Sequence, residues 1–230
     1  MIYLNSKELQ SLFLGNQEME KVYFGERLVW ERFKVIALGY GTTFDVSNIS
    51  GFENFSADNF FVKVNETASV SDRVTGSQSG EDGGINTYLN KSYNATTGIF
   101  SFNYRAVSDG GRVSQVGGYA FLIPELNKFI ENGKMIDLGE GTSWDIKALM
   151  PNKYQDFTID NFAIQRANTC MTGNVYYGGT FNYSGYGTLS LNYNKNTGIL
   201  TGRNSITMTN NGGGYINNNS ASIRPFLLVK

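Results

Sequence analysis

The sequence predicts an all-β protein made of an arm and two related domains. Short runs rich in Val, Ile, Thr, Phe and Tyr alternate with clusters of Gly, Asn, Asp and Ser about every ten residues. No long stretch carries apolar residues at the 3.6-residue period of a helix. The second half of the chain also repeats motifs of the first half at a spacing of about 100 residues.

The repeat consists of three motifs that occur in the same order in both halves. They are a Gly-x-Gly-Thr-x-aromatic-Asp start, a central Asp-Asn-Phe, and a Tyr-Asn-x-x-Thr-Gly-Ile stretch. The matched segments are 35–46 with 135–146, 58–60 with 160–162, and 93–99 with 193–199. Trp144 replaces Phe44 in the first motif, and we interpret both as packing residues. The chain therefore divides into residues 1–33, 34–128 and 129–230.

Residues 1–33 form an arm with a pattern of their own. We expect short strands that turn at Gly15-Asn16 and at Gly25-Glu26. About 30 residues bury too little apolar area to be stable alone, so the arm must dock on another part of the chain, a sister subunit or another protein. Exposed strand edges suit assembly by strand addition. The residues able to pack together are Val22, Phe24, Leu28 and Trp30.

Each repeat is expected to be a β-sandwich. In the third motif, the Asn- and Thr-rich run before Gly98 and Gly198 suits a hairpin turn whose glycine has a positive φ. Each repeat has about 95 residues with strands at this spacing, which favours an Ig-like or jelly-roll-like sandwich over a barrel. The spacing does not determine the order in which the strands pair. Residues 125–133, which follow Pro124, are expected to connect the two domains with a helical turn.

The composition excludes several functional classes. The chain has no His, which removes the Ser-His-Asp and Cys-His nucleophile pairs and any His-liganded zinc. A net charge of -1 and a pI near 5.6 provide no positive field for nucleic acid or an anionic membrane. A lone Cys170 excludes an intrachain disulfide framework. The sequence indicates neither a signal peptide nor a membrane span.

The arm and the repeats resemble structural proteins of tailed bacteriophages and prophages of Gram-positive bacteria, especially tail, baseplate and fibre components. The likeness covers nearly the whole chain and rests on the three repeat motifs and on a Leu-Gly, Lys-Val-Tyr, Gly, Leu-Val-Trp pattern in the arm. The arm residues that carry it, and that we expect to anchor the protein, are Leu14, Gly15, Val22, Tyr23, Gly25, Leu28, Val29 and Trp30.

The resemblance implies a non-enzymatic building block of the virion, assembled in the host cytoplasm and without a cofactor. The arm is expected to attach to other virion proteins while the β domains project toward host cell-wall carbohydrate at the tail or baseplate. A head fibre or capsid decoration protein follows the same plan and stays open as an alternative. The resemblance also implies a homo-oligomer, often a trimer.

Glycoside hydrolysis is the enzymatic alternative, because a pair of carboxylates suffices for it. The acids present in both repeats are Asp45 with Asp58 and Asp145 with Asp160. Asp-Asn-Phe is also a common turn or capping arrangement in which the carboxylate accepts backbone N–H bonds, and we favour that structural interpretation. Glu81 and Asp82 lie in a Gly-rich loop but lack the alternating ligands of a calcium loop, so no metal site is predicted.

Carbohydrate binding is the remaining candidate for a site. Sugar recognition combines aromatic rings with Asn and Asp hydrogen bonds in a shallow site, and the second repeat supplies both. Alternate members of the same run would face the core if the segment were an ordinary strand, and that interpretation stays open. The candidate glycan-binding residues are Tyr176, Tyr177, Tyr183, Tyr186, Asn174 and Asn182.

Overall fold

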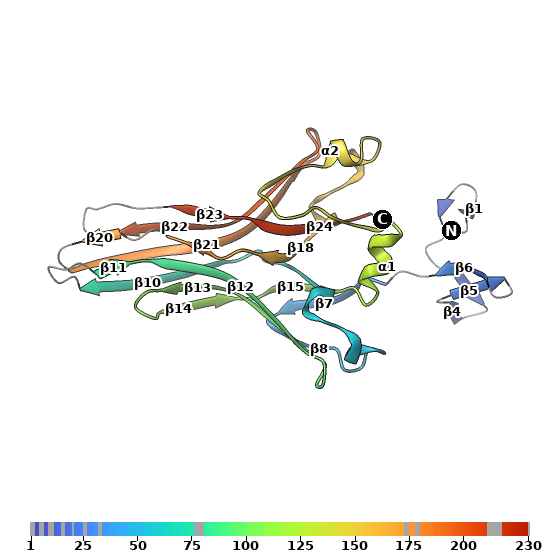
Figure 1. Cartoon of the computed structure of the whole chain (residues 1–230), viewed down its shortest axis with the longest axis horizontal. Coiled ribbons are helices and arrows are strands. Elements are labelled where there is room, and N and C mark those ends of the chain that lie inside the picture. The colour runs from blue at the N-terminus through green and yellow to red at the C-terminus, as the bar shows by residue number, and fades with distance from the viewer. Residues whose placement is uncertain are drawn as a thin grey trace. The chain divides into compact units, whose positions relative to one another are not determined.

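The computed structural model in Figure 1 is mostly β-sheet, which confirms the all-β class. It forms two compact units, Met1–Val35 and Ile36–Lys230. The residues that the structure describes are 3–4, 7–8, 12–14, 17–19, 21–24, 27–31, 34–75, 81–172, 175–177, 180–210 and 218–229, with side chains described over 34–73, 84–172, 182–209 and 218–229. No helix among them is long and apolar enough to cross a membrane.

The N-terminal unit consists, in its described part, of three antiparallel strand pairs. The strands flank the turns expected from the sequence, since Leu14 pairs with Gln17 and Phe24 pairs with Arg27. Gly15 and Gly25 themselves lie outside the described residues. The pairs are β1 (Tyr3–Leu4) with β2 (Lys7–Glu8), β3 (Leu12–Leu14) with β4 (Gln17–Met19), and β5 (Lys21–Phe24) with β6 (Arg27–Glu31).

The second unit contains the same order of elements twice. The first repeat comprises β7 (Ile36–Gly41), β8 (Thr43–Asp45), η1 (Phe52–Asn54), η2 (Ala57–Asn59), β9 (Phe60–Lys63), β10 (Thr67–Thr75), β11 (Glu81–Gly83), β12 (Ile85–Asn94), β13 (Ile99–Ser108), β14 (Val113–Val116) and β15 (Gly118–Leu122). The helix α1 (Leu126–Glu131) lies in the predicted connection. The second repeat comprises β16 (Met135–Asp137), β17 (Ser143–Asp145), α2 (Ile146–Leu149), η3 (Tyr154–Asp156), η4 (Ile159–Asn161), β18 (Phe162–Ala167), β19 (Cys170–Met171), β20 (Val175–Tyr177), β21 (Thr180–Asn194), β22 (Ile199–Asn210), β23 (Asn219–Ala221) and β24 (Ile223–Leu228).

Three larger sheets build this unit, and each contains strands of both repeats. The central sheet has the order β16-β24-β18-β9-β15-β7. A second sheet, β14-β13-β12-β19 with β8 added, takes β19 from the second repeat. A third sheet, β10-β21-β22-β17 with β23 added, takes β10 from the first repeat. Figure 1 shows the long strands side by side, with the β12–β13 and β21–β22 hairpins diverging toward one end.

The structure therefore does not separate residues 34–128 and 129–230 into two β-sandwiches. The repeats exchange strands: all nine residues of β10 pair with β21, and β19 pairs with β12. Because these ladders cross the expected boundary, both repeats belong to one compact unit. The sequence pattern predicts the strands but not which strands pair. An antiparallel ladder can form with any strand of suitable length whose apolar side chains point to the same face of the sheet.

The exchange gives the two halves an approximate two-fold relation, in which residues meet their own counterparts. Val62 pairs with Ile164 where β9 adjoins β18. Tyr104 donates a hydrogen bond to Asn204 Oδ1 over 2.7 Å. At another such position a larger residue lies against a glycine: Thr87 contacts its counterpart Gly187, where an added Cβ would lie only 2.2 Å from Thr87 Cγ2.

The main core lies between the sheets and includes both aromatic residues of the first motif. Phe44 and Trp144 are buried, as predicted. Phe60 stacks on Phe100 with ring centroids 4.0 Å apart. A second cluster lies on the α1 side of the central sheet, where Phe61 packs edge to face against Phe226 at 5.2 Å.

Candidate functional site

The Asp-Asn-Phe motif positions a loop that borders a cavity of the second unit, Ile36–Lys230, which we call the body. Ser56 Oγ accepts the backbone N–H of Asp58 over 3.3 Å, and Asn59 Oδ1 accepts that of Ser56 over 2.9 Å. This capping box closes η2, and the Asn59 amide then donates to the backbone oxygens of Ile123 and Pro124. The motif thus ties the start of β9 to the end of β15.

The second repeat builds the same cap with Thr158 and Asn161, whose amide donates to Leu228 O over 3.1 Å. The predicted structural role of the motif is confirmed, with one correction. The capping atoms come from Ser or Thr and from Asn, whereas the aspartates form ion pairs across the repeats. Lys63 bonds Asp160 over 3.2 Å, and Arg166 bonds both carboxylate oxygens of Asp58 over 2.8 Å.

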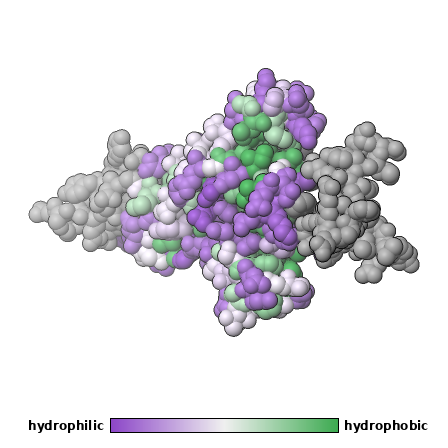
Figure 2. All heavy atoms as spheres, turned by 45° about the vertical axis from the view of Figure 1, so that its right-hand side comes forward, coloured by the Kyte–Doolittle hydropathy of each residue, from purple (hydrophilic) through white to green (hydrophobic). Residues whose placement is uncertain are grey.

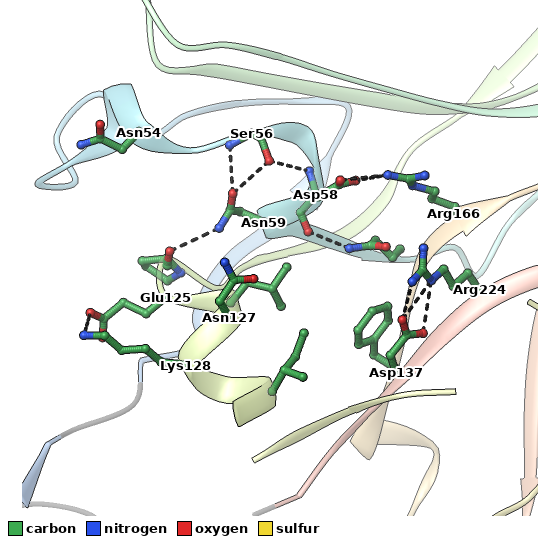
Figure 3. Close-up of a pocket in the computed structure, with 15 residues that line it drawn as sticks. Asn54, Ser56, Asp58, Asn59, Glu125, Asn127, Lys128, Asp137, Arg166 and Arg224 are labelled. Carbon is green, nitrogen blue, oxygen red and sulfur yellow. Dashed lines mark hydrogen bonds and ion pairs between the residues drawn. The ribbon is translucent and has the colours of Figure 1, made fainter. Parts of the chain in front are cut away.

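A cavity of about 630 Å³ opens beside this loop (Figure 3). Its walls come from residues 54–59, from residues 124–130 with helix α1, and from strands β16, β18 and β24. The exposed Ile130 supplies apolar surface, and Gln165, itself buried, donates from Nε2 to the backbone oxygen of Asp58 over 3.0 Å. Polar and apolar groups therefore face each other across one cavity.

Three ion pairs line the cavity and balance its charge. Besides the pair between Arg166 and Asp58, Arg224 binds Asp137 through Nε, at 3.2 Å from each carboxylate oxygen, and through Nη2. Lys128 binds Glu125 over 2.6 Å. Burial alone raises the pKa of Asp137, but the hydrogen bonds from Arg224 and from the Gly139 N–H outweigh it, so the pKa lies below its usual value.

The two other acids considered for hydrolysis serve as caps. Asp45 Oδ1 accepts the Ser47 N–H, and Asp145 Oδ1 accepts the Ala148 N–H at the start of α2, each over 2.9 Å. The hydrogen bonds from Ser47 lower the pKa of Asp45, whereas a general acid needs a raised pKa. The carboxylates shared by the repeats are thus engaged in caps or ion pairs.

The candidate glycan residues do not form one described surface. Tyr183 is only 2% exposed and its side chain belongs to the core, so it cannot contact a surface ligand. Burial raises its pKa above the usual tyrosine value. Tyr186 is 45% exposed and Asn182 is exposed. Tyr176 and Tyr177 lie in β20, opposite Asp82 and Glu81, with side chains outside the described set, and Asn174 is outside the described residues.

A second groove, of about 640 Å³, adjoins Asn182 and Ser184. Asp72 lies in it and accepts a short hydrogen bond from the Ser108 hydroxyl, which lowers the pKa of Asp72. Arg73 and Arg112 also line this groove. Tyr183 also lines this groove, but only 2% of its surface is exposed, so the walls are mainly polar.

Apart from Asp58, which was considered for hydrolysis, the charged residues of the first cavity were missed by the sequence analysis. One signal was present, since Asp137 occupies the position of Ala37 in the matched first motifs. A charge in an otherwise apolar strand needs a partner, and Arg224 supplies it from the neighbouring β24. The pairing itself joins residues far apart in the chain, so it could not be inferred locally.

Hydrophilic residues predominate on the face of the described body that Figure 2 shows, with hydrophobic patches between them. Within the described residues, no group of three or more His, Cys, Asp or Glu side chains is placed to hold a metal ion. The side chains of Glu81 and Asp82 lie outside that set. No family model, curated protein or solved structure matches the chain.

Proposed function

We propose that this chain is a structural protein of a tailed-bacteriophage particle. Its N-terminal arm attaches it to other virion proteins, and its body projects for adhesion to host cell-wall carbohydrate at the tail or baseplate. The observation that carries the proposal is the division of the chain after Val35, which gives the anchoring motif a compact unit of its own. The proposed location is the virion, assembled in the host cytoplasm.

The arm suits attachment because its strands are short and occur in pairs. Isolated two-stranded ribbons are marginally stable in water, and their outer edges carry unpaired backbone groups. In β5 and β6, Val22 lies opposite Trp30 and Tyr23 lies opposite Leu28, so the motif residues from Val22 to Trp30 that the structure describes share one ribbon. A partner protein that adds a strand to this ribbon would satisfy those backbone groups and stabilise the arm.

The body suits binding rather than catalysis. Its described grooves are lined by hydrogen-bonding side chains, and the carboxylates repeated in both halves serve caps and ion pairs. Weak contacts to a wall polymer become effective when many copies of the chain occur on one particle. We infer a homo-oligomer, with a trimer as the working model, and no enzymatic activity.

The arm's role is tested by deleting residues 1–33 from the gene in the producing phage. We expect the shortened protein to be absent from purified particles, because the anchoring ribbon is gone. A matched variant, Leu149→Gln, changes an exposed residue of the body and should be incorporated normally. Circular dichroism of the purified shortened protein should show that the body remains folded. Normal incorporation without the arm would contradict the anchoring role.

A further inference from the structure

We propose that the cavity beside α1 is a binding site for a neutral saccharide unit. The proposal rests on the adhesive part of the function proposed above and assigns it to a site remote in sequence from the tyrosine-rich segment. Figure 3 shows the loop of residues 54–59 on one side of the cavity, α1 on another, and Arg166 and Arg224 at its end.

The cavity has the amphipathic character of a sugar ring. Ile130, on α1, is 40% exposed although it is a large apolar residue, and it supplies the apolar surface of the cavity. The loop of residues 54–59 supplies the polar side chains of Asn54, Ser56 and Asp58. A sugar ring presents C–H groups on its faces and hydroxyls around its edge, so one ligand can contact both kinds of wall.

Hydrogen-bond donors remain free for such a ligand. Arg166 contacts Asp58 only through Nη2, and Arg224 contacts Asp137 through Nε and Nη2. Within the described residues, Nη1 of each guanidinium makes no hydrogen bond. The exposed amides of Asn54 and Asn127 likewise have no hydrogen-bond partner in the part of the chain that the structure describes. Hydrogen bonds from charged donors to neutral hydroxyls are stronger than those between neutral groups.

The balance of charge selects a neutral ligand. Three cationic and three anionic side chains line the cavity, and every cation is already paired with a carboxylate. An anionic ligand would have to displace or approach those carboxylates, which costs free energy. A neutral saccharide can accept the remaining guanidinium hydrogens without breaking an ion pair.

The test uses the full-length chain labelled with ¹⁵N and titrated with three probes. Chitobiose and maltotriose are the neutral saccharides, and glycerol 3-phosphate is the anionic control. We expect a saccharide to shift the amide resonances of residues 54–59 and 126–130. Asn54→Ala combined with Asn127→Ala should weaken binding at least fivefold, because both residues line the cavity and neither amide has a hydrogen-bond partner among the described residues. Ile130→Gln should weaken it comparably, whereas Leu149→Gln, the matched exposed aliphatic residue on α2, should not.

Three results would overturn the proposal. The first is that neither saccharide shifts any amide resonance at about 20 mM, a concentration well above the millimolar dissociation constants of weak single sites. The second is that the shifts are confined to segments other than 54–59 and 126–130. The third is that glycerol 3-phosphate binds more tightly than both saccharides. Binding is measured on the purified chain and arm anchoring on phage particles. The two proposals can therefore fail separately.

Discussion

Val62 and Ile164 occupy equivalent positions in the two repeats and lie opposite each other where β9 pairs with β18. The pair marks the approximate two-fold relation of the body. On either side of it, Lys63 binds Asp160 and Arg166 binds Asp58, so each repeat supplies a cation to the Asp-Asn-Phe motif of the other. The Asp-Asn-Phe motif, which occurs in both repeats, is thus also a site of ion pairs between them.

The same relation explains where the repeats differ in sequence. Near a two-fold axis a residue meets its own counterpart, and at two of these positions there is no room for a second large side chain. Ile85 therefore faces Gly185, where an added Cβ would lie 2.5 Å from the isoleucine Cδ1, and Thr87 faces Gly187. Close packing of the core requires one small member in each of these pairs.

Gly187→Ala should destabilise the body by about 2 kcal/mol, because the new methyl group overlaps Thr87 Cγ2 and also lies 2.7 Å from Tyr104 Oη. Thr87→Ser removes that methyl but keeps the hydroxyl that donates to Asn204. We expect the double variant to be more stable than Gly187→Ala alone when both are unfolded in urea. Simple additivity of the two changes would argue against direct contact between the positions.

Asn204→Leu should destabilise the protein by about 3 kcal/mol. The hydroxyls of Thr87 and Tyr104 both donate to Asn204 Oδ1, at 2.8 and 2.7 Å, and the substitution leaves two buried polar groups without that acceptor. Tyr104→Phe removes one hydroxyl and should cost about 1 kcal/mol. Urea unfolding of both variants provides the comparison, and equal stability of Asn204→Leu and the original chain would contradict the assigned network.

Separate repeats should not fold as monomers. Residues 36–123 alone lose the strand that β21 provides to β10, and residues 134–229 alone lose the partner of β19. We expect each fragment to be unfolded or self-associated in size-exclusion chromatography. Mixed during refolding, they should form a one-to-one complex with the spectrum of the intact body. A stable monomeric fragment would show that strand exchange is dispensable.

Stability should rise with pH between about 7 and 8. Burial lowers the pKa of Lys91 to about 7, with Asp58 opposing and Arg166 adding to that shift. The pKa of a lysine in an unfolded chain is about 10.4, so in this window the unfolded state binds more protons than the folded state and the free energy of unfolding increases with pH. Urea unfolding at several pH values between about 7 and 8 measures the slope, because Cys170, whose pKa burial raises in the folded chain, and the tyrosines ionise in the unfolded chain at higher pH.

Lys91→Met provides the control for that slope. The Lys91 ammonium donates to the backbone oxygens of Phe60 and Gln165, the latter over 2.9 Å, and the methionine removes the titrating group while keeping most of the side-chain volume. We expect a flatter dependence of unfolding free energy on pH. An unchanged slope in the variant would assign the effect to another group.

Local features of the fold were accessible from the sequence. The hairpin glycines Gly98 and Gly198 have φ values of 69° and 73°, as the turn pattern predicts. Strand pairing could not be predicted from the sequence, because β10 presents the same backbone N–H and C=O groups to any antiparallel neighbour. Its pairing with β21 follows from packing of the whole body.

The candidate site was predicted less well for a related reason. Tyrosine spacing could not decide which side chains face solvent, and the structure buries Tyr183 while exposing Tyr186. The cavity beside α1 depends on contacts such as that between Asp58 and Arg166, which are 108 residues apart. No local pattern in either segment indicates such a contact.

The central claim is that this chain is part of a phage particle, and immunogold electron microscopy tests it most directly. Particles released by the strain that encodes the chain would be purified and labelled with an antibody against the full-length protein. We predict label at the tail tip, in agreement with adhesion at the tail or baseplate. Label over the head would instead support the capsid-fibre alternative, and particles without any label would contradict the virion assignment.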